Sequence, residues 1–131
     1  MNLTVDDLAD YLATNGMGTV AHDIWPGQRP ESPDEVLTLM EYPGGAPGYT
    51  QSGVVSENPQ VQVSTRGRDY EETRKRCQRA WALFSMFVNR NLNGVWYYRI
   101  MPQHSVFLAG RDQNGRHIFA FNMSVSKEVE A

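Results

Sequence analysis

The sequence predicts an α+β domain in which two helices pack on a mixed, mostly antiparallel β-sheet with a C-terminal β-hairpin. Three observations support this fold class. Residues 61–79, VQVSTRGRDYEETRKRCQR, change from the period-two pattern of a strand to the three-and-four spacing of a helix. A second set of apolar residues at helical spacing lies at the start of the chain. Asn114–Gly115 separates two strand-like segments near the end of the chain. The 131 residues are most simply one domain, 1–131.

The first part of the chain is predicted to contain one helix and two strands. Thr4 is expected to cap the helix, with Asp7 as the carboxylate that reaches back, and Gly16 is expected to end it. Strands are expected at residues 19–25 and 36–42, with a proline-punctuated loop over 26–33. Residues 43–58, PGGAPGYTQSGVVSEN, show no periodicity, so we expect a long flexible loop there.

The second part is predicted to contain a strand, a long helix, a further strand and the hairpin. Gly67 ends the first strand, and Asp69 with Glu72 three residues later forms a capping box for a helix over residues 70–91. A strand follows over 95–101. A two-residue type I′ turn at Asn114–Gly115 would place Phe121 opposite Leu108. It would also place Met123 opposite Val106, and the tail over 127–131 is expected to be frayed.

Charge is distributed unevenly along the chain. Residues 1–58 contain nine acids against Arg29 alone, a balance of −8, whereas the remainder carries +5, which gives −3 overall. Two oppositely charged regions can steer one copy of a protein onto the next. Folding could also interleave the two regions and cancel their fields, since position along a chain is a poor guide to position on a surface.

Composition excludes several classes of protein. The single Cys77 cannot form an internal disulfide or a multi-thiolate zinc site, which favours an intracellular origin. The N-terminus lacks a positive region and a long apolar run, and nowhere do 18 apolar residues follow one another. We therefore expect neither a signal peptide nor a membrane-spanning helix, and no membrane partner.

No catalytic, cofactor-binding or metal-binding residue is predicted. His22, His104 and His117 are scattered and lack the short spacing of metal ligands. Cys77 lies on the apolar side of the predicted long helix, where a thiol behaves as a small hydrophobe. The glycine clusters at 16–18 and 44–48 lack the strand, helix start and GK[ST] motif of a phosphate loop.

A basic cluster occupies the strand-to-helix junction. Guanidinium groups bind phosphates well, so this cluster could contact nucleic acid. Acidic residues are interleaved with it, which favours a solvated helix face or an acidic protein partner. The cluster consists of Arg66, Arg68, Arg74, Lys75, Arg76 and Arg79, and the interleaved acids are Asp69, Glu71 and Glu72.

Five segments, in this order and spacing, are similar to the small tail terminator proteins of long-tailed bacteriophages, also described as phage minor capsid or tail completion proteins. They are NGMGT at 15–19, DIWPGQRP at 23–30, PGGAPG at 43–48, VQVSTRGRDYEET at 61–73 and GRDQNGRHIFAFNMSV at 110–125. The similarity covers nearly the whole chain. The similarity lies in turn and helix-cap motifs and not in catalytic residues, so no catalytic or ligand role is carried over.

The resemblance implies a structural virion protein without enzymatic activity or a cofactor. A hexameric ring of such domains would close the head-proximal end of the tail tube, stop tube polymerisation and face the head connector. The implied partners are other copies of the chain, the tail tube protein and the head–tail connector protein, with DNA only passing transiently through the lumen. The implied location is the virion, and the host cytoplasm during assembly.

A ring of identical subunits needs two different patches on each chain, because its contacts are heterologous. The candidate subunit or partner contacts are Arg66, Arg68, Arg74 and Arg76 on one side, with Asp34, Glu35, Glu57 and Tyr49 on the other. Three alternatives remain. They are another phage neck or head-completion protein, a nucleic-acid-binding module that uses the basic cluster, and an enzyme, which the lack of a plausible nucleophile, base or metal cluster disfavours.

Overall fold

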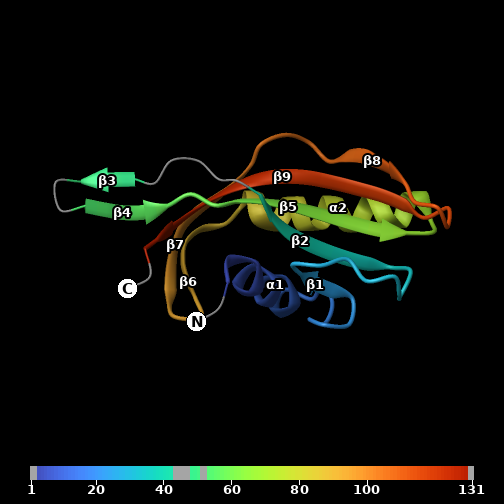
Figure 1. Ribbon diagram of the computed structural model, residues 1–131, viewed down its shortest axis with the longest axis horizontal. Coiled ribbons are helices and arrows are strands. Elements are labelled where there is room, and N and C mark those ends of the chain that lie inside the picture. Colours follow the sequence, from blue (N-terminus) through green and yellow to red (C-terminus); the bar gives the residue numbers. More distant parts are fainter. Residues whose placement is uncertain (1–2, 43–47, 51–52, 130–131) are drawn as a thin grey trace.

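The computed structural model describes residues 3–42, 48–50 and 53–129, with side chains described for 3–42 and 56–129. The described residues form two helices and a nine-stranded, mixed, mostly antiparallel sheet, which confirms the predicted α+β class (Figure 1). The elements are α1 (Thr4–Thr14), β1 (Ile24–Pro26), β2 (Val36–Tyr42), β3 (Gly48–Thr50), β4 (Gly53–Glu57), β5 (Gln60–Gly67), α2 (Tyr70–Ser85), β6 (Val88–Leu92), β7 (Val95–Pro102), β8 (Phe107–Arg111) and β9 (His117–Glu128).

The twelve-residue strand β9 is the centre of the sheet. β5 and β4 pair with one side of it, and β8 and β7 pair with the other, all antiparallel. β2 continues the sheet beyond β5, and β1 joins β2 in parallel. β6 pairs with β7, and β3 pairs with β4. One long strand therefore connects four neighbours that are far apart in the sequence.

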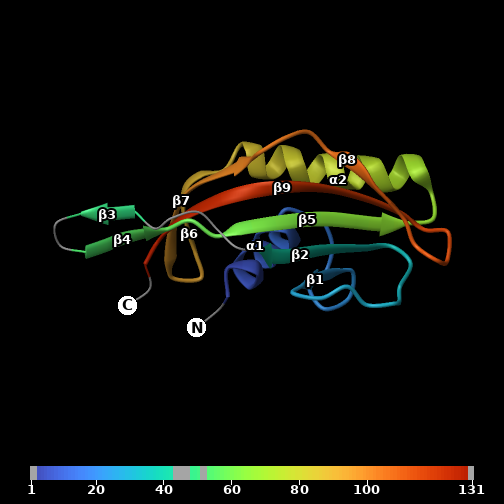
Figure 2. The same cartoon turned by 45° about the horizontal axis from the view of Figure 1, so that its top comes forward.

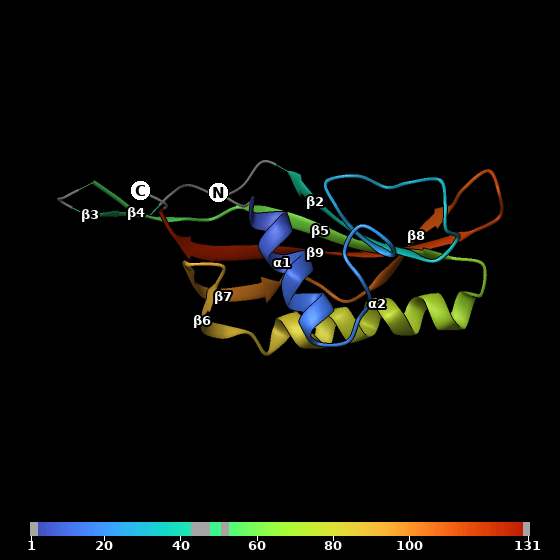
Figure 3. The same cartoon turned by 90° about the horizontal axis from the view of Figure 1, so that it is seen from below.

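Alternating residues of β5 and β9 form the apolar inner face of the sheet. Val61 lies opposite Met123 and Val63 lies opposite Phe121, and all four side chains are fully buried. Figure 3 shows α2 running along this face. Each fully buried side chain of this size contributes about 1.5–3 kcal/mol, so this pairing fixes which face of β9 turns inward.

The two helices contact one another at the end of the core. α1 packs near β1, β2 and β6, and its Tyr11 ring lies 5.8 Å from the ring of Phe84 and 5.2 Å from the ring of Phe87. Phe84 lies in the last turn of α2, and Phe87 follows the helix. The C-terminal end of α2 and helix α1 thus share one apolar cluster with the sheet.

The helix ends confirm some predicted caps and correct others. Asp69 caps α2 as predicted, since its Oδ1 accepts the Glu72 N–H at 2.8 Å. Gly16, at φ +81°, follows the end of α1 as predicted. The predicted Thr4 cap is wrong, because Thr4 is the first helical residue and Leu3 precedes it. Leu3 has no side-chain acceptor, and the Oδ2 atom of Asp6 accepts its N–H instead, at 3.0 Å.

Asp7 does not cap the start of α1 as predicted but forms buried hydrogen bonds with other elements. It is 1% exposed, and its Oδ2 atom accepts the Tyr97 hydroxyl at 2.5 Å. Its Oδ1 atom accepts Asn93 Nδ2 at 2.8 Å. Nearby, buried Lys127 donates to Thr4 Oγ1 at 2.9 Å, with its Nζ 5.5 Å from the Tyr97 ring centre. This polar cluster ties α1 to β7 and to the end of β9.

The predicted end of the long helix at residue 91 is wrong. α2 ends at Ser85, and residues 88–92 form strand β6. Leu92 pairs with Val95, so Asn93 and Gly94, at φ +53° and +88°, form a two-residue hairpin turn. Positive φ at both residues is the requirement of a type I′ turn. This Asn–Gly pair therefore joins two strands.

The C-terminal hairpin is present, but its predicted register is wrong. Leu108 lies opposite Phe119 instead of Phe121, and Val106 precedes β8, so it is not opposite Met123. The turn is longer than two residues, because the Asp112 N–H donates to the Arg116 carbonyl at 3.0 Å. A bulge between Leu108 and Gly110 shifts the register further. β7 covers residues 95–102, which confirms the predicted strand at 95–101.

Three further segments differ from the prediction. The strand expected at 19–25 is reduced to β1, because the Thr19 N–H donates to Asp23 Oδ1 at 2.7 Å and closes a turn. The loop expected at 43–58 contains β3 and β4, while 43–47 and 51–52 lie outside the described residues. The tail expected to fray from 127 continues β9 through Glu128, and 130–131 lie outside the described residues.

β2 coincides with the strand predicted at 36–42. No helix in the described part of the chain is long and apolar enough to cross a lipid bilayer.

The Asp7 cluster generates a stability prediction. Tyr97→Phe removes the hydroxyl that donates to the buried Asp7 carboxylate, so we expect the free energy of unfolding to fall by about 1–3 kcal/mol. Tyr98→Phe is the matched control, because the neighbouring ring is 39% exposed, and we expect a change within about 0.5 kcal/mol. Urea unfolding measures both. Equal stability of the two variants would contradict a structural role for this hydrogen bond.

Candidate functional site

The strand-to-helix junction is held in one tight arrangement. A Cβ atom on Gly67 would overlap Thr73 Oγ1 and would lie 3.5 Å from Glu35 Cγ, so any other residue here would displace the Thr73 side chain. Thr73 Oγ1 donates to the Asp69 carbonyl at 2.5 Å, and Thr65 Oγ1 donates to the Thr73 carbonyl at 2.9 Å. These bonds fix the direction in which α2 leaves β5.

Arg66 is a structural residue of this junction. It is 3% exposed, and it follows Thr65 in β5, whose hydroxyl donates to the Thr73 carbonyl of α2, so strand alternation places Arg66 on the opposite, outer face of the sheet. Figure 3 shows the segment between β1 and β2 on the side of the sheet opposite α2. The Arg66 guanidinium donates to the carbonyls of Pro33 at 2.8 Å and of Glu31 and Asp34 at 3.2 Å each. Arg66 therefore binds residues 31–35, the acidic loop, to β5.

Arg116 holds the same loop from the hairpin side. Its side chain is 3% exposed and donates to Asp112 Oδ2 at 2.7 Å, the Glu31 carbonyl at 2.6 Å and Glu31 Oε2 at 3.0 Å. A fourth contact reaches Asp34 Oδ1 at 3.3 Å. Burial acts to lower the pKa of Arg116, but the hydrogen bonds to Asp112 and Glu31 outweigh it and raise the pKa. The buried cation is thus fully paired, as a stable interior charge must be.

Arg68 completes the network at the surface. Its Nε atom donates to Asp34 Oδ2 at 2.6 Å, and its Nη1 atom donates to the Asn114 carbonyl at 3.2 Å. The hydrogen bond from Arg68 is the main cause of the lowered pKa of Asp34. Burial acts to raise the pKa of Asp112, but donors from the backbone and side chain of Arg116 lower it overall. Arginines and acids of this region therefore neutralise one another within one chain.

The predicted subunit contact is only partly available at the surface. Arg66 is 3% exposed, so its side chain is not offered to a neighbour on the surface of the single chain. Asp34 already binds Arg68 and Arg116 inside the chain. Arg76 is half-buried, and burial lowers its pKa, against the opposing charges of Asp23 and Glu35.

The remaining candidates are distributed over different elements. Arg74 is exposed on α2, and Glu35 is exposed in the acidic loop. Glu57 is half-buried in β4, opposite Lys127 of β9. Tyr49 belongs to β3, and its side chain lies outside the described ones. All of these residues stay predicted contact residues, and among the described side chains Arg68, Arg74 and Glu35 are the exposed ones.

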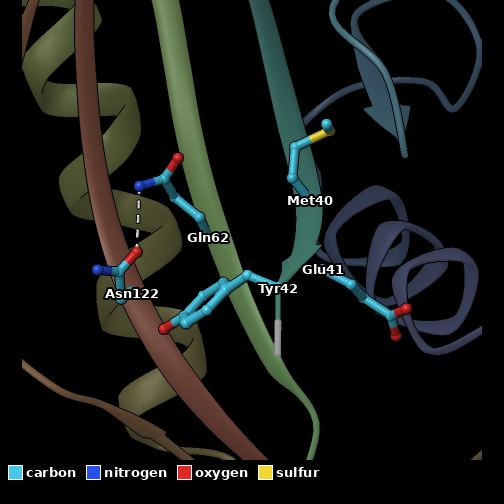
Figure 4. A pocket seen from close by; sticks show the side chains of 5 residues that line it. All are labelled: Met40, Glu41, Tyr42, Gln62 and Asn122. Atoms are coloured by element: carbon cyan, nitrogen blue, oxygen red, sulfur yellow. Dashed lines mark hydrogen bonds between the residues drawn. The ribbon is translucent and has the colours of Figure 1, made fainter. Parts of the chain in front are cut away.

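A shallow pocket of about 250 Å³ lies on the outer face of the sheet (Figure 4). Gln62 Nε2 donates to Asn122 Oδ1 at 3.1 Å across its floor, and the Tyr42 side chain points toward β9. Burial raises the pKa of Tyr42. The Glu41 carboxylate points away from these groups. The described lining offers amide and phenol hydrogen bonds, without the acid/base pair that catalysis needs.

Two further sequence predictions concern the position of Cys77 and possible metal ligands. Cys77 is fully buried, which confirms the predicted core position, and burial raises its pKa to about 12. Within the described residues, no three histidine, cysteine or acidic side chains gather as a metal ion would require.

Sequence reasoning missed Arg116, Asp112 and Glu31 as partners. The available signal was the spacing of Asp112 and Arg116, which flank the Asn–Gly pair and face each other across a turn. The Asp112 carboxylate accepts the N–H groups of Asn114 at 3.0 Å and Arg116 at 2.9 Å, so it organises the turn as well as the guanidinium. The third partner, Glu31, is 85 residues away from Arg116 and carries no local signal.

Comparison with known protein families identifies a match. Residues 11–129 match a protein-family model described as "Bacteriophage tail terminator protein". A search of curated proteins finds no match.

The Arg116 network yields a stability prediction. Arg116→Met removes the donors to Asp112 and to the Glu31 carbonyl, so we expect the free energy of unfolding to fall by about 1–3 kcal/mol. Arg111→Met, an exposed arginine of the same hairpin, is the control and should change stability by less than about 0.5 kcal/mol. Urea denaturation measures both variants. A loss of equal size in the control would show that the buried network has no special role.

The lowered pKa values generate a prediction about acid. Asp34 and Asp112 have pKa values below the ordinary 3.8, so the folded state binds fewer protons than the unfolded chain near that pH. Their contribution to stability is complete above pH 3.8 and is lost as the pH falls through the folded values. We expect the urea midpoint to fall between about pH 5 and pH 2.5, and to fall less steeply in Asp34→Asn.

The control for the acid series is Glu71→Gln, which removes an exposed carboxylate 3.6 Å from Lys75. We expect this variant to follow the wild-type slope. If Asp34→Asn and the wild type lose stability in parallel, the ion pairs of Asp34 do not contribute to the acid dependence.

Proposed function

The chain belongs to the bacteriophage tail terminator family, and on this premise we propose that it caps the head-proximal end of the tail tube. Membership of this family makes it a structural component of the phage virion. In the proposed role, the cap ends polymerisation of the tube protein and presents a surface to the head connector. The family match over residues 11–129 carries this proposal, because it includes every described element except the start of α1.

The proposed cap is a hexameric ring of this chain. Its neighbours are the tail tube protein on one side and the head–tail connector protein on the other, and DNA passes through the lumen only transiently. A ring needs heterologous contacts between different patches. Arg68, Arg74 and Glu35 are exposed on the single chain and can take part in one such patch, in which the Arg68 backbone N–H donates to Glu35 Oε1 at 3.4 Å.

The nucleic-acid-binding alternative loses support because part of its basic cluster is buried or paired. Arg66 is buried, Arg76 is half-buried, and Arg68 shares its charge with Asp34. A DNA-binding surface needs several free cations that can neutralise phosphates together. The alternative of another neck or head-completion protein is separated from the proposal by the following experiment.

Phage particles made without this chain should show its role directly. We expect electron microscopy of such lysates to show overlong tube polymers without heads, because nothing stops addition of the tube protein. Supplying the wild-type chain from a plasmid should restore tails of normal length and is the control. Full heads beside finished tails of normal length would contradict the proposal and identify a head-side adaptor.

A further inference from the structure

A two-stranded arm projects from the sheet. The arm consists of β3 and β4, and Figures 1 and 2 show it extending beyond the other strands at one end of the molecule. β3 pairs only with β4 in the described part of the chain. β4 joins the body through two residue pairs, Ser56 with Glu128 and Glu57 with Lys127. An isolated two-stranded ribbon is marginally stable in water, so this arm requires a further neighbour.

A second strand also lacks a neighbour. β8 pairs with β9 on one side and with no described strand on the other. Two of its large apolar side chains are exposed, Phe107 at 40% and Leu108 at 47%. No proline or charged residue precedes Arg111 in this strand. Such an edge presents unpaired backbone groups beside apolar surface, which is a template for an added strand.

The other two edges of the body carry protective features. β1 is three residues long and ends in Pro26, which has no N–H to donate. β6 contains Arg90 and has a positive φ of +39° at Asn89, which disturbs its extended backbone. Short strands, proline, charge and irregularity are the means by which proteins block edge pairing. Of these features, β8 has only an irregularity, the bulge at Ala109. This bulge limits the hydrogen bonds with an added strand to a few residues.

The arm and β8 lie toward opposite ends of the long axis of the molecule (Figures 1 and 2). The arm of one copy therefore does not reach its own β8. Between two copies, the same separation produces a head-to-tail contact, and repeated head-to-tail contacts close into a ring when the rotation allows it. The lengths of the two strands also agree. β3 has three residues, and the bulge in β8 leaves only a short regular segment of β8 for pairing.

Neither the arm nor β8 carries charges that would oppose pairing between them. The sequence from Gly48 to Ser56 has no Lys, Arg, Asp or Glu, and neither does β8 before Arg111. Bringing the two edges together therefore buries no unpaired charge and opposes no like charges. Strand addition gives affinity through main-chain hydrogen bonds, which do not depend on a particular side-chain sequence.

We propose that the arm of one copy adds as a strand to the β8 edge of the next copy. This contact links neighbouring copies in the ring. It also gives the arm and β8 an additional paired strand each. This inference rests on the proposed function, since the ring is part of that proposal, and it names the elements that would join one subunit to the next.

Cross-linking between two differently labelled copies tests the contact. Thr50→Cys in β3 and Ala109→Cys in β8 are purified separately, mixed, and treated with a short bis-maleimide. Buried Cys77 stays unmodified in the folded chain. We expect a cross-linked dimer in the mixture and only background in either variant alone. The control mixture pairs Thr50→Cys with Ala82→Cys, an exposed position on α2, and should give background.

A second pair of variants tests the edge itself. Phe107→Lys places a charge on β8, and Met86→Lys places one at an apolar position that is 81% exposed beyond α2. Light scattering should show loss of the assembled species for Phe107→Lys and an unchanged mass for Met86→Lys. Near-ultraviolet circular dichroism confirms that both variants fold.

The outcomes separate the contact from the function. If the mixed Thr50→Cys and Ala109→Cys variants assemble but give no cross-link between residues 50 and 109, or if the Phe107→Lys variant still assembles, the proposed contact is overturned and the ring is left in place. Cross-linking of residue 50 to tail tube protein instead of to residue 109 also overturns it. If the wild type does not assemble, with or without tube protein, and the mixed cysteine variants do not cross-link, the ring itself is contradicted.

Discussion

The pairing of β9 with four other strands is the constraint on which the rest of the structure depends. Its twelve residues are long enough for β5 and β4 to bind one side while β8 and β7 bind the other. Its inward-facing residues, among them Phe119, Phe121 and Met123, form the floor on which α2 packs. Each end carries a buried cation, Arg116 just before the strand and Lys127 near its end. These cations attach the acidic loop at one end and α1 at the other.

Burial of charge explains why the arginine-rich junction is structural. An interior guanidinium is stable only when acceptors surround it, and the acidic loop supplies both carbonyl and carboxylate oxygens. Arg66 uses only backbone carbonyls, whereas Arg116 also uses the Asp112, Glu31 and Asp34 carboxylates. The opposite charges seen along the sequence therefore meet largely inside one chain. The subunit contact is better sought at unpaired strand edges than among paired charges.

Much of the fold was predictable because its signals are local. The alternation that defines β5, the strand at 36–42 and the Asp69 cap each depend on a few neighbouring residues. The two Asn–Gly pairs show the limit. Asn93–Gly94 forms the two-residue hairpin turn between β6 and β7, because Leu92 pairs with Val95 directly across it. Asn114–Gly115 lies in a longer turn, because the Asp112 carboxylate accepts two of its backbone N–H groups.

The parts that sequence reasoning missed depend on distant partners. The region at 43–58 has no periodicity, yet β4 forms there because the far end of β9 offers an edge. The exposed candidates Arg68, Arg74 and Glu35 were found from charge, but the burial of Arg66 follows from a loop about 35 residues away in the chain. Family membership could be predicted, since the order of turn and cap motifs survives such local errors.

The central claim is that this chain closes one end of the tail tube. Cryo-electron microscopy of tails purified apart from heads tests it most directly. The account predicts a single ring of this chain at the head-proximal end, with the β3–β4 arm of each copy on the β8 edge of its neighbour. A bare tube end, with the chain recovered on the heads, would contradict it.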